Sequence, residues 1–344
     1  MAEQVYGKDR LLLGIDLGSA TTAVVSNRGY RNSIPSVVGY PKDIIAIKML
    51  GKTQVFGDEA LEKHSALTLY HPMRDAVIQE GGKRDYNASA ELLRHVIGLA
   101  TNGEAGPVSG IIAAPARTSP AGKEALQRIA SQLLDAALVI SDPILVAYHL
   151  DQLDKCLVID IGASTIDICA VKGTVPSPQD QAILPKAGEY IDDRLQSMIS
   201  QHYPDVQITR NLARRIKEEH GFVGQAAEPV LVTLRSRGKP RQYDVTSELG
   251  MVCESIVPEI LEQLTSMLKA FDPEDQENAL QNIYLAGGGA HLRGLNAKIA
   301  EAMRDYGQVL VRSIEEPEYA GARGALRLAT DLPLEKWQAF GLSG

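Results

Sequence analysis

The same short pattern occurs twice in this chain, about 144 residues apart. Residues 15–22 read Ile-Asp-Leu-Gly-Ser-Ala-Thr-Thr, and residues 159–165 read Ile-Asp-Ile-Gly-Ala-Ser-Thr. In both copies an apolar run ends in Asp, an apolar residue, Gly, two small residues and Thr. A repeat of this size predicts two homologous halves that face one another. The chain has 344 residues, which is long enough for two domains with separate cores.

Each copy of the pattern predicts a tight turn that can bind phosphate. Small residues after a strand let the backbone come close to a ligand, and consecutive N–H groups there form a concave anion site. A carboxylate at the strand end, Asp16 or Asp160, can hold a hydrated Mg²⁺. One such turn alone is more often an ordinary β-turn. Two copies with matching flanks predict that a polyphosphate is gripped from both sides.

Strand and helix patterns alternate along the chain. Short apolar runs predict strands at Leu11–Asp16, Ile111–Ala114, Leu138–Ile140, Cys156–Ile159 and Ile283–Ala286. The first run continues into a hairpin with its tip at 18–20, and residues 36–68 indicate a small inserted subdomain. Strands that alternate with helices indicate the α/β class with parallel sheets.

Two helices are expected to begin at cap residues. Ser119 precedes Pro120, and the apolar side chains that follow repeat on one helical face. Asp142 precedes Pro143 and is expected to cap a second helix that runs to about Leu150.

A third glycine motif, Gly287–Gly289, directly follows the strand at 283–286. As the third member of the set it fits a platform for a nucleoside. The spacing of a Rossmann dinucleotide site and the lysine of a P-loop are both absent from the sequence, so neither of those nucleotide-binding classes is expected.

Composition narrows the class of protein further. Lys and Arg total 35 and Asp and Glu total 43, and the resulting net charge of -8 argues against nucleic acid as a partner. The polar N-terminus is not a signal peptide, and no apolar run reaches membrane-spanning length, so no insertion into a membrane is expected. The three cysteines suit a reducing cytoplasm as buried apolar residues. The seven histidines show no zinc-ligand spacing.

The order of these motifs resembles that of the actin, Hsp70 and sugar-kinase superfamily. Residues 187–193 (Ala-Gly-Glu-Tyr-Ile-Asp-Asp) and 214–218 (Arg-Arg-Ile-Lys-Glu) look like nucleotide-contacting segments of actins. Residues 37–43 and 172–176 are similar to the MamK family, the bacterial actin-like proteins of magnetosome chains. The resemblance covers nearly the whole chain.

The resemblance implies an α/β, actin-like ATPase fold. Two homologous RNase H-like domains would surround a nucleotide cleft, each with a smaller outer subdomain. Subdomain IA would comprise 1–33, 69–149 and 322–344, and IB would comprise 34–68. Subdomain IIA would comprise 150–188 and 262–321, and IIB would comprise 189–261.

The resemblance also assigns site residues. Asp142 and Asp160 are the catalytic candidates, although Asp142 could be only a helix cap. Asp16 and Asp160 would hold Mg²⁺ through water. The remaining nucleotide-binding candidates are Gly18, Ser19, Ala20, Thr21, Gly162, Ala163, Ser164, Thr165, Gly188, Arg214, Lys217, Glu218, Gly287, Gly288, Gly289 and His291. Asp75 would lie near the γ-phosphate, unless it is an ordinary surface residue.

Two of these positions depart from the family pattern. Asp142 stands where bacterial actins usually carry Glu, and Ser164 stands where the second turn usually carries Gly. A carboxylate misplaced by about 1 Å can cost roughly 10²-fold in rate. The Cβ of Ser164 would crowd a phosphate if its φ were positive, or its hydroxyl could add a hydrogen bond. We therefore expect ATP to bind and to be hydrolysed slowly.

The resemblance implies an ATP- and ADP-binding protein that polymerises in the cytoplasm and positions magnetosomes. Its partners would be further copies of itself, a paralogous actin-like protein and magnetosome-associated adaptors. An Hsp70-type chaperone is disfavoured because only about 55 residues follow the last glycine motif. The alternatives that stay open are a small-molecule kinase of the same superfamily and an MreB-like shape scaffold.

Overall fold

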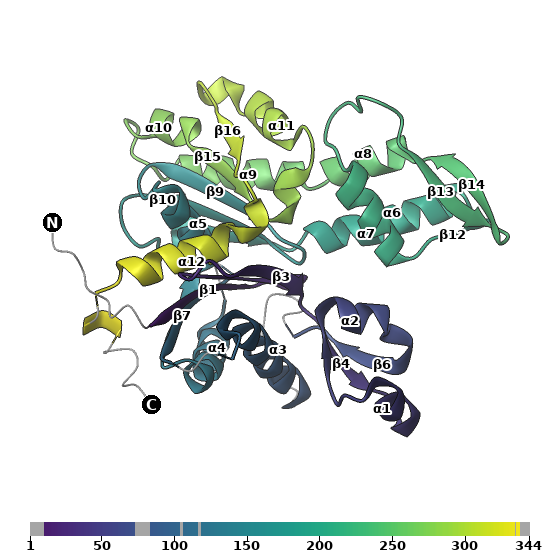
Figure 1. The fold of residues 1–344 in the computed structure, drawn as a ribbon. Coiled ribbons are helices and arrows are strands. Elements are labelled where there is room, and N and C mark those ends of the chain that lie inside the picture. The colour runs from purple at the N-terminus through teal and green to yellow at the C-terminus, as the bar shows by residue number, and fades with distance from the viewer. Residues whose placement is uncertain (1–9, 73–82, 104–105, 116–117, 334, 338–344) are drawn as a thin grey trace. The chain divides into compact units, whose positions relative to one another are not determined.

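The computed structural model describes residues 10–72, 83–103, 106–115, 118–333 and 335–337. The chain forms two compact units (Figure 1). Unit 1 comprises Met1–Gln152 and Glu318–Gly344, and unit 2 comprises Leu153–Pro317. The finer division into four subdomains stays a prediction.

The central sheets of the two units have the same topology. In unit 1 the strand order is β3 (Arg31–Pro35), β2 (Thr21–Ser26), β1 (Leu11–Leu17), β7 (Val108–Ala114) and β8 (Ala136–Ser141). In unit 2 it is β11 (Gln181–Leu184), β10 (Ile166–Val171), β9 (Cys156–Ile161), β15 (Ile283–Ala286) and β16 (Val311–Ser313). The first three strands of each sheet pair antiparallel, and the other pairings are parallel.

The register of the two hairpins is also the same. Asp16 lies opposite Ala23 in unit 1, and Asp160 lies opposite Asp167 in unit 2, so each Asp pairs with the residue seven positions later. The sequence repeat therefore corresponds to one strand–turn–strand unit built twice, which confirms the predicted duplication.

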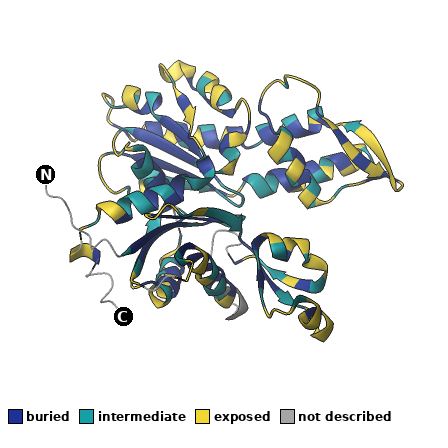
Figure 2. Cartoon of the chain, in the orientation of Figure 1, coloured by how far each residue is buried: buried dark blue, intermediate teal, exposed yellow. Residues whose placement is uncertain are grey.

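Helices cover both faces of the unit 1 sheet. Residues 13, 15 and 17 of β1 pack with α3 (Lys83–Thr101) and α4 (Pro120–Leu133), whereas Leu12 packs with α5 (Asp142–Leu150) and α12 (Ala320–Asp331). This alternation follows from the two-residue period of a strand. The central strands β1 and β7 are almost entirely buried, whereas β3 at the edge is partly exposed (Figure 2).

Glycines let α12 come unusually close to its neighbours in unit 1. A methyl group at Gly14 would lie 2.0 Å from the carbonyl oxygen of Ala322, and one at Gly324 would lie 1.8 Å from that of Leu145. Both distances are far below van der Waals contact, so α12 reaches β1 and α5 only because these side chains are absent.

A small sheet forms a separate part of unit 1. It has the order β5 (Val55–Phe56), β4 (Val38–Pro41) and β6 (Leu67–Tyr70), with helices α1 (Ile44–Leu50) and α2 (Gly57–Glu62). Its own core consists of Val37, Val55, Ala60 and Leu67.

Unit 2 has a single continuous core that extends from its central sheet into a second, three-stranded sheet. The second sheet has the order β12 (Val206–Gln207), β13 (Leu231–Ser236) and β14 (Lys239–Asp244). The helices of the unit are α6 (Gly188–His202), α7 (Arg210–His220), α8 (Thr246–Glu254), α9 (Val257–Leu268), α10 (Gln276–Gln281) and α11 (Leu295–Ala302).

Most local predictions are confirmed. All five predicted strands are present, and Ser119 caps α4 by accepting a hydrogen bond from the N–H of Gly122 at 3.0 Å. The three cysteines are buried and free. The prediction that Asp142 is a helix cap is wrong: Ser141 is the N-cap residue, and Asp142 is the first residue of α5. β8 runs directly into this helix, so the helix starts one residue earlier than the Asp-Pro pair suggests.

Within the described residues, no helix is both long enough and apolar enough to cross a membrane.

Candidate functional site

The turn after β1 is closed too tightly to accept a side chain at its glycine. The N–H of Gly18 donates to the carbonyl of Thr21 at 3.1 Å, and a methyl group at Gly18 would lie 2.8 Å from that oxygen. Beneath the turn, the hydroxyl of Ser36 donates to the carbonyl of Gly18 at 2.6 Å and lies 2.8 Å from the hydroxyl of Thr22. Sequence reasoning missed Ser36, which lies eighteen positions from the turn that it supports.

Two predicted carboxylates of unit 1 lie against the first turn of α12. A methyl group at Gly321 would lie 1.9 Å from Oδ1 of Asp142 and 3.3 Å from Oδ2 of Asp16. Asp142 is buried, with 6% of its surface exposed. β1 and β8 both run parallel to β7 and end at the same edge of the sheet, which explains why residues 126 positions apart meet here. Gly321 was not predicted, although the small residues around it are visible in the sequence.

The turn of unit 2 is closed in the same way. The N–H of Gly162 donates to the carbonyl of Thr165 at 2.9 Å. The start of α6 is docked on this turn, because the N–H of Gly188 donates to the carbonyl of Gly162 at 3.2 Å and the N–H of Glu189 donates to that of Ala163 at 2.7 Å. A methyl group at Gly188 would lie 3.3 Å from the Cα of Ala163, so a glycine lets the two segments approach.

Ser164 does not adopt the conformation that would crowd a phosphate. It is absent from the described non-glycine residues with positive φ, so the steric argument against a serine here is wrong. Its Oγ is buried and has no hydrogen-bond partner among the residues that the structure describes. A buried hydroxyl in a turn of backbone donors is able to donate to a phosphate oxygen, which favours the second of the two predicted possibilities.

A buried ion pair fixes Lys217 beneath the same turn. Its Nζ lies 2.7 Å from Oδ1 of Asp192 and donates to the carbonyl of Gly188 at 2.9 Å. The two side chains are 13% and 4% exposed. Burial raises the pKa of Asp192, although Lys217 acts in the opposite direction. Lys217 is therefore not on a solvated helix face.

The glycine run after β15 lies against the end of β9. A methyl group at Gly287 would lie 2.1 Å from Oδ1 of Asp160, and one at Gly289 would lie 2.1 Å from Cγ2 of Ile161. Gly287 has a φ of 70°, which favours glycine. None of the described residues has an atom within 4 Å of where the Cβ of Gly288 would be, so there is open space beside this glycine.

The other predicted residues are more exposed. Arg214 and Glu218 form an ion pair with each other at 2.7 Å on α7, with 41% and 53% of their side chains exposed. His291 is exposed in the short helix after Gly288. Asp75 lies outside the described residues.

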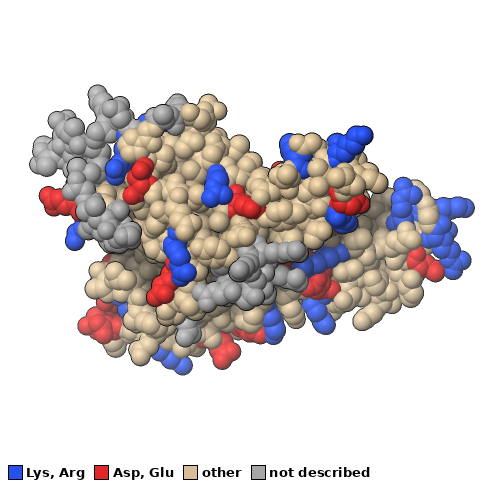
Figure 3. Space-filling view, turned by 90° about the horizontal axis from the view of Figure 1, so that it is seen from below, with Lys and Arg blue, Asp and Glu red and all other residues tan. Residues whose placement is uncertain are grey.

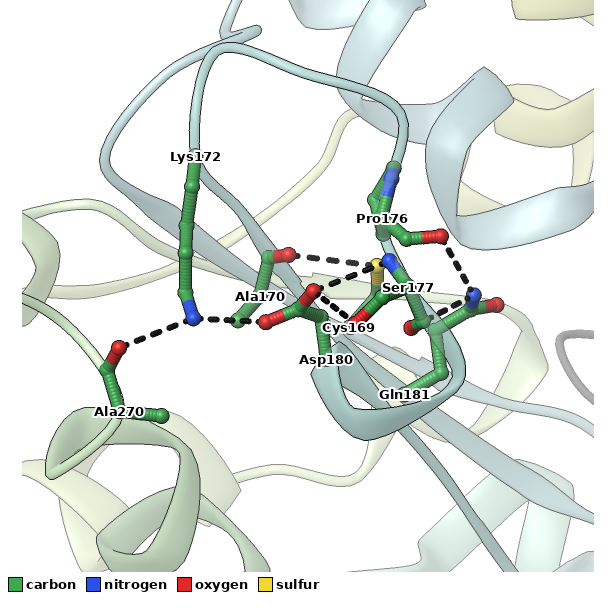
Figure 4. A network of polar contacts seen from close by, with 8 residues as sticks. All are labelled: Cys169, Ala170, Lys172, Pro176, Ser177, Asp180, Gln181 and Ala270. Atoms are coloured by element: carbon green, nitrogen blue, oxygen red, sulfur yellow. Dashed lines mark hydrogen bonds and ion pairs between the residues drawn. The ribbon is translucent and has the colours of Figure 1, made fainter.

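The segment at 172–176, which resembles the MamK family, is held by a polar network (Figure 4). Lys172 contacts Oδ1 of Asp180 at 2.6 Å and the carbonyl of Ala270 at 3.0 Å, and Asp180 accepts hydrogen bonds from the N–H and hydroxyl of Ser177. Burial acts to raise the pKa of Asp180, but the bonds from Lys172 and Ser177 outweigh it and lower that pKa. The segment thus connects the loop around Asp180 to the end of α9 within unit 2.

These residues fit a magnesium nucleotide. Each unit offers a tight turn with backbone donors, and glycines leave the space that side chains would fill. The described residues contain no group of three or more His, Cys, Asp or Glu that could hold a metal ion by themselves. Mg²⁺ suits such a donor set, because it keeps several waters and takes one or two carboxylates together with phosphate oxygens.

Known proteins resemble this chain closely. The family model of the MreB/Mbl proteins matches residues 10–336. The actin-like protein MamK of Paramagnetospirillum magneticum is 45% identical over 334 residues, which cover 97% of this chain and 96% of that protein. A solved MamK double helical filament has a TM-score of 0.92 at 45% identity and covers 94% of this chain and 100% of that one.

A second solved structure shows a bound nucleotide analogue. It is a non-polymerising MamK mutant bound to AMPPNP, with a TM-score of 0.76 at 44% identity, and it covers 94% of this chain and 100% of that one. The shared fold is actin-like, as the sequence predicted. The chain therefore belongs to the MreB/Mbl family and, within it, to the actin-like MamK proteins.

Proposed function

We propose that this protein binds ATP with Mg²⁺, hydrolyses it slowly and polymerises into cytoplasmic filaments that align magnetosomes. The observation that carries the proposal is the duplicated turn. The two central sheets have the same topology, and in each of them the middle strand, β1 or β9, ends in an Asp-x-Gly turn that is closed by the same hydrogen bond. The filament structure of a relative 45% identical in sequence supports the polymerisation step.

In this proposal, each part of the turns has a role. The backbone N–H groups of residues 19–21 and 163–165 bind phosphate oxygens, and the hydroxyl of Ser164 donates a further hydrogen bond. Asp16 and Asp160 are the carboxylates that would hold Mg²⁺. When bound, the ion would supply positive charge that offsets the charge of the phosphates.

Asp142 orients the attacking water. Its carboxylate is buried and seated against Gly321, so its position is well defined. Slow turnover follows from the shorter reach of Asp compared with Glu. Ser164 does not slow hydrolysis through a steric clash, because its φ is not positive. Further copies of the chain are the main partner, and adaptors on the magnetosome surface or a paralogous actin-like protein would be additional ones.

Light scattering with simultaneous phosphate release tests the proposal. The purified protein is compared with ATP, with ADP and without nucleotide, each in the presence of Mg²⁺. We expect scattering to rise only when nucleotide is present, and phosphate to appear slowly. Phosphate release that requires an added metabolite, without any rise in scattering, would show that the protein is a small-molecule kinase instead.

Replacing Asp142 by Asn tests its catalytic role. Loss of the carboxylate should lower the rate of phosphate release by about 10²-fold, because a group that positions and polarises water contributes about that much. Affinity for ATP, measured by equilibrium binding of a labelled nucleotide, should stay nearly unchanged. Asp305→Asn, at a residue whose side chain is 92% exposed, is the matched control. Equal rates for the two variants would exclude Asp142 from catalysis.

A further inference from the structure

Ser36 holds the turn after β1 through both its side chain and its main chain. Its hydroxyl donates to the carbonyl of Gly18 at 2.6 Å and accepts from the hydroxyl of Thr22 at 2.8 Å, because one hydroxyl can donate only once. Its N–H donates to the carbonyl of Ala20 at 2.8 Å. Ser36 is 1% exposed and Thr22 is 0% exposed, so water does not compete for these bonds. A single buried residue therefore fixes three positions of the turn.

The residue after Ser36 already belongs to another part of unit 1. β3 of the central sheet ends at Pro35, and β4 of the small sheet begins at Val38. Val37, between them, is one of the buried residues that form the separate core of the small sheet. Its carbonyl also accepts a hydrogen bond from the N–H of Gly57, the first residue of α2, at 3.1 Å. The chain thus passes from the support of the turn to the core of the small sheet in one step.

The connection between the turn and the small sheet is short and stiff. The peptide unit that joins Ser36 to Val37 is planar, so few dihedral angles can change between the two. The start of α2 also packs against β3, because a methyl group at Gly57 would lie only 3.3 Å from Cβ of Ile34. A displacement of Ser36 is therefore passed on to the small sheet and is not absorbed by a loop.

We propose that Ser36 is a positioning residue that couples phosphate binding at the turn after β1 to the order of the small sheet. The N–H groups of residues 19–21 would be fixed when they bind a phosphate. The fixed turn would then fix Ser36 and, through Val37, the small sheet. Ordering of one segment by a ligand in this way lowers the cost of ordering the next. The inference rests on the proposed nucleotide binding and names the residue through which a nucleotide would act on the small sheet.

The coupling contacts involve no ionised side chain. They join the hydroxyl, N–H and carbonyl groups of Ser36, Thr22, Gly18 and Ala20. Charged side chains lie on the surface instead, where Figure 3 shows Lys and Arg interspersed with Asp and Glu. Salt screens exposed charges but acts little on buried neutral hydrogen bonds. The coupling should therefore persist from about 0.1 M to about 1 M salt, and its loss at high salt would contradict these contacts as its route.

Steady-state constants separate a positioning role from a catalytic one. Ser36→Ala removes a hydrogen bond to the turn, and such a bond is typically worth a change of about 2- to 12-fold in an equilibrium constant. The KM for ATP should rise by about that factor. The kcat should stay within about twofold, because the carboxylate of Asp142 is seated on Gly321 and not on this turn. A lower kcat with an unchanged KM would overturn the positioning role.

Hydrogen exchange of the small sheet tests the coupling itself. In the wild type, saturating ATP with Mg²⁺ should slow amide exchange in β4 and β6 by about fivefold or more, since coupling between sites is usually at least that large. In Ser36→Ala, saturating ATP should change that exchange less than about twofold. Ser65→Ala, at an exposed position in the short helix before β6, is the matched control and should respond like the wild type. Exchange in β7 should stay slow in every variant, which shows that unit 1 remains folded.

A second experiment measures the same coupling without nucleotide. Gly18→Ala forces the turn to shift, because the added methyl group would lie 2.8 Å from the carbonyl oxygen of Thr21. The change should speed exchange in β4 and β6 when Ser36 is present and should have little further effect in Ser36→Ala. Equal effects in the two backgrounds would overturn the proposal, and so would an ATP response of Ser36→Ala equal to that of the wild type. A wild type that binds no ATP but shows this dependence on Ser36 would sink the proposed nucleotide binding and leave the coupling standing.

Discussion

At the scale of single residues, Gly321 is the position that most directly shapes the site of unit 1. The carboxylates of Asp16 and Asp142 both lie against the space where a side chain at this position would be. Filling that space would displace the carboxylate of Asp142 and would crowd that of Asp16. The glycine thus acts on the site without offering any functional group of its own.

Replacing Gly321 by Ala should displace the carboxylate of Asp142. The added methyl group would lie 1.9 Å from Oδ1, a distance that atoms do not tolerate, so the carboxylate must move. A shift of about 1 Å should lower the rate of phosphate release roughly 10²-fold. Gly98→Ala, on α3, is the control and should leave the rate unchanged, because no atom of the described part of the chain lies within 4 Å of the added methyl group. A Gly321→Ala protein with the rate of the wild type would show that the seat of Asp142 is not critical.

Of the site residues, the local turns could be predicted from the sequence, but the contacts between distant segments could not. Both turns were predicted because Asp-x-Gly is a local pattern. The support from Ser36 and the seat at Gly321 were missed, because each depends on a contact between segments far apart in the sequence. The helix start at Asp142 was misplaced by one residue, because a local cap pattern does not reveal that β8 continues directly into α5.

At the scale of elements, α6 and α7 are joined by a buried contact beneath the turn of unit 2. The ion pair between Lys217 and Asp192 connects them, and Lys217 also reaches the carbonyl of Gly188 at the start of α6. Arg210 of α7 adds exposed contacts to Glu189 and Asp193. Loss of the buried pair should lower the free energy of unfolding more than loss of the exposed contacts, because an unpaired charge would remain inside the protein.

A double-mutant cycle tests this contact. Lys217→Met should lower the free energy of unfolding by about 3–5 kcal/mol, because Asp192 is then buried without its partner. Adding Asp192→Leu should recover part of that loss, since both charges are then gone. Urea unfolding monitored by circular dichroism measures each step. Arg214→Ala removes the exposed pair with Glu218 and, as control, should cost less than about 1 kcal/mol. Additive effects of the two core changes would contradict the coupling.

The elements were predictable to different extents. The central strands were found because each is a short apolar run, and the repeat indicated that the two sheets would correspond. The sheet of β12, β13 and β14 was not predicted as strands, because its exposed strand β14 is too polar to stand out. The sequence likewise did not reveal that the side chain of Lys217 is only 13% exposed, since that depends on packing between two helices.

At the scale of the whole molecule, the three cysteines all belong to unit 2 and none is accessible to solvent. Cys156, Cys169 and Cys253 are each 0% exposed. Burial raises the pKa of Cys156 and of Cys169 to about 12 and that of Cys253 to about 11. The reactive thiolate is therefore scarce near neutral pH, and the reagent cannot reach the sulfur in the folded unit.

Thiol labelling should consequently report on the opening of unit 2 alone. In native protein at pH 8, Ellman's reagent should react only as fast as unit 2 unfolds locally, whereas in guanidinium chloride all three thiols should react at once. Absorbance of the released thiolate measures both rates. Rapid reaction of any one cysteine in the native protein would contradict the burial described here. Asp192→Asn should speed native labelling, because it weakens the pair inside the same unit.

The path of the chain through the two units has a consequence for synthesis. Unit 1 is discontinuous: its sheet is made first, but α12, which seats on Gly14 and Leu145, follows unit 2 in the sequence. Since domains generally fold in the order in which the ribosome makes them, unit 2 is complete before unit 1 can close. Until then, the face of β1 and α5 that α12 will cover stays exposed. Unit 1, although its synthesis starts first, therefore completes its folding after unit 2.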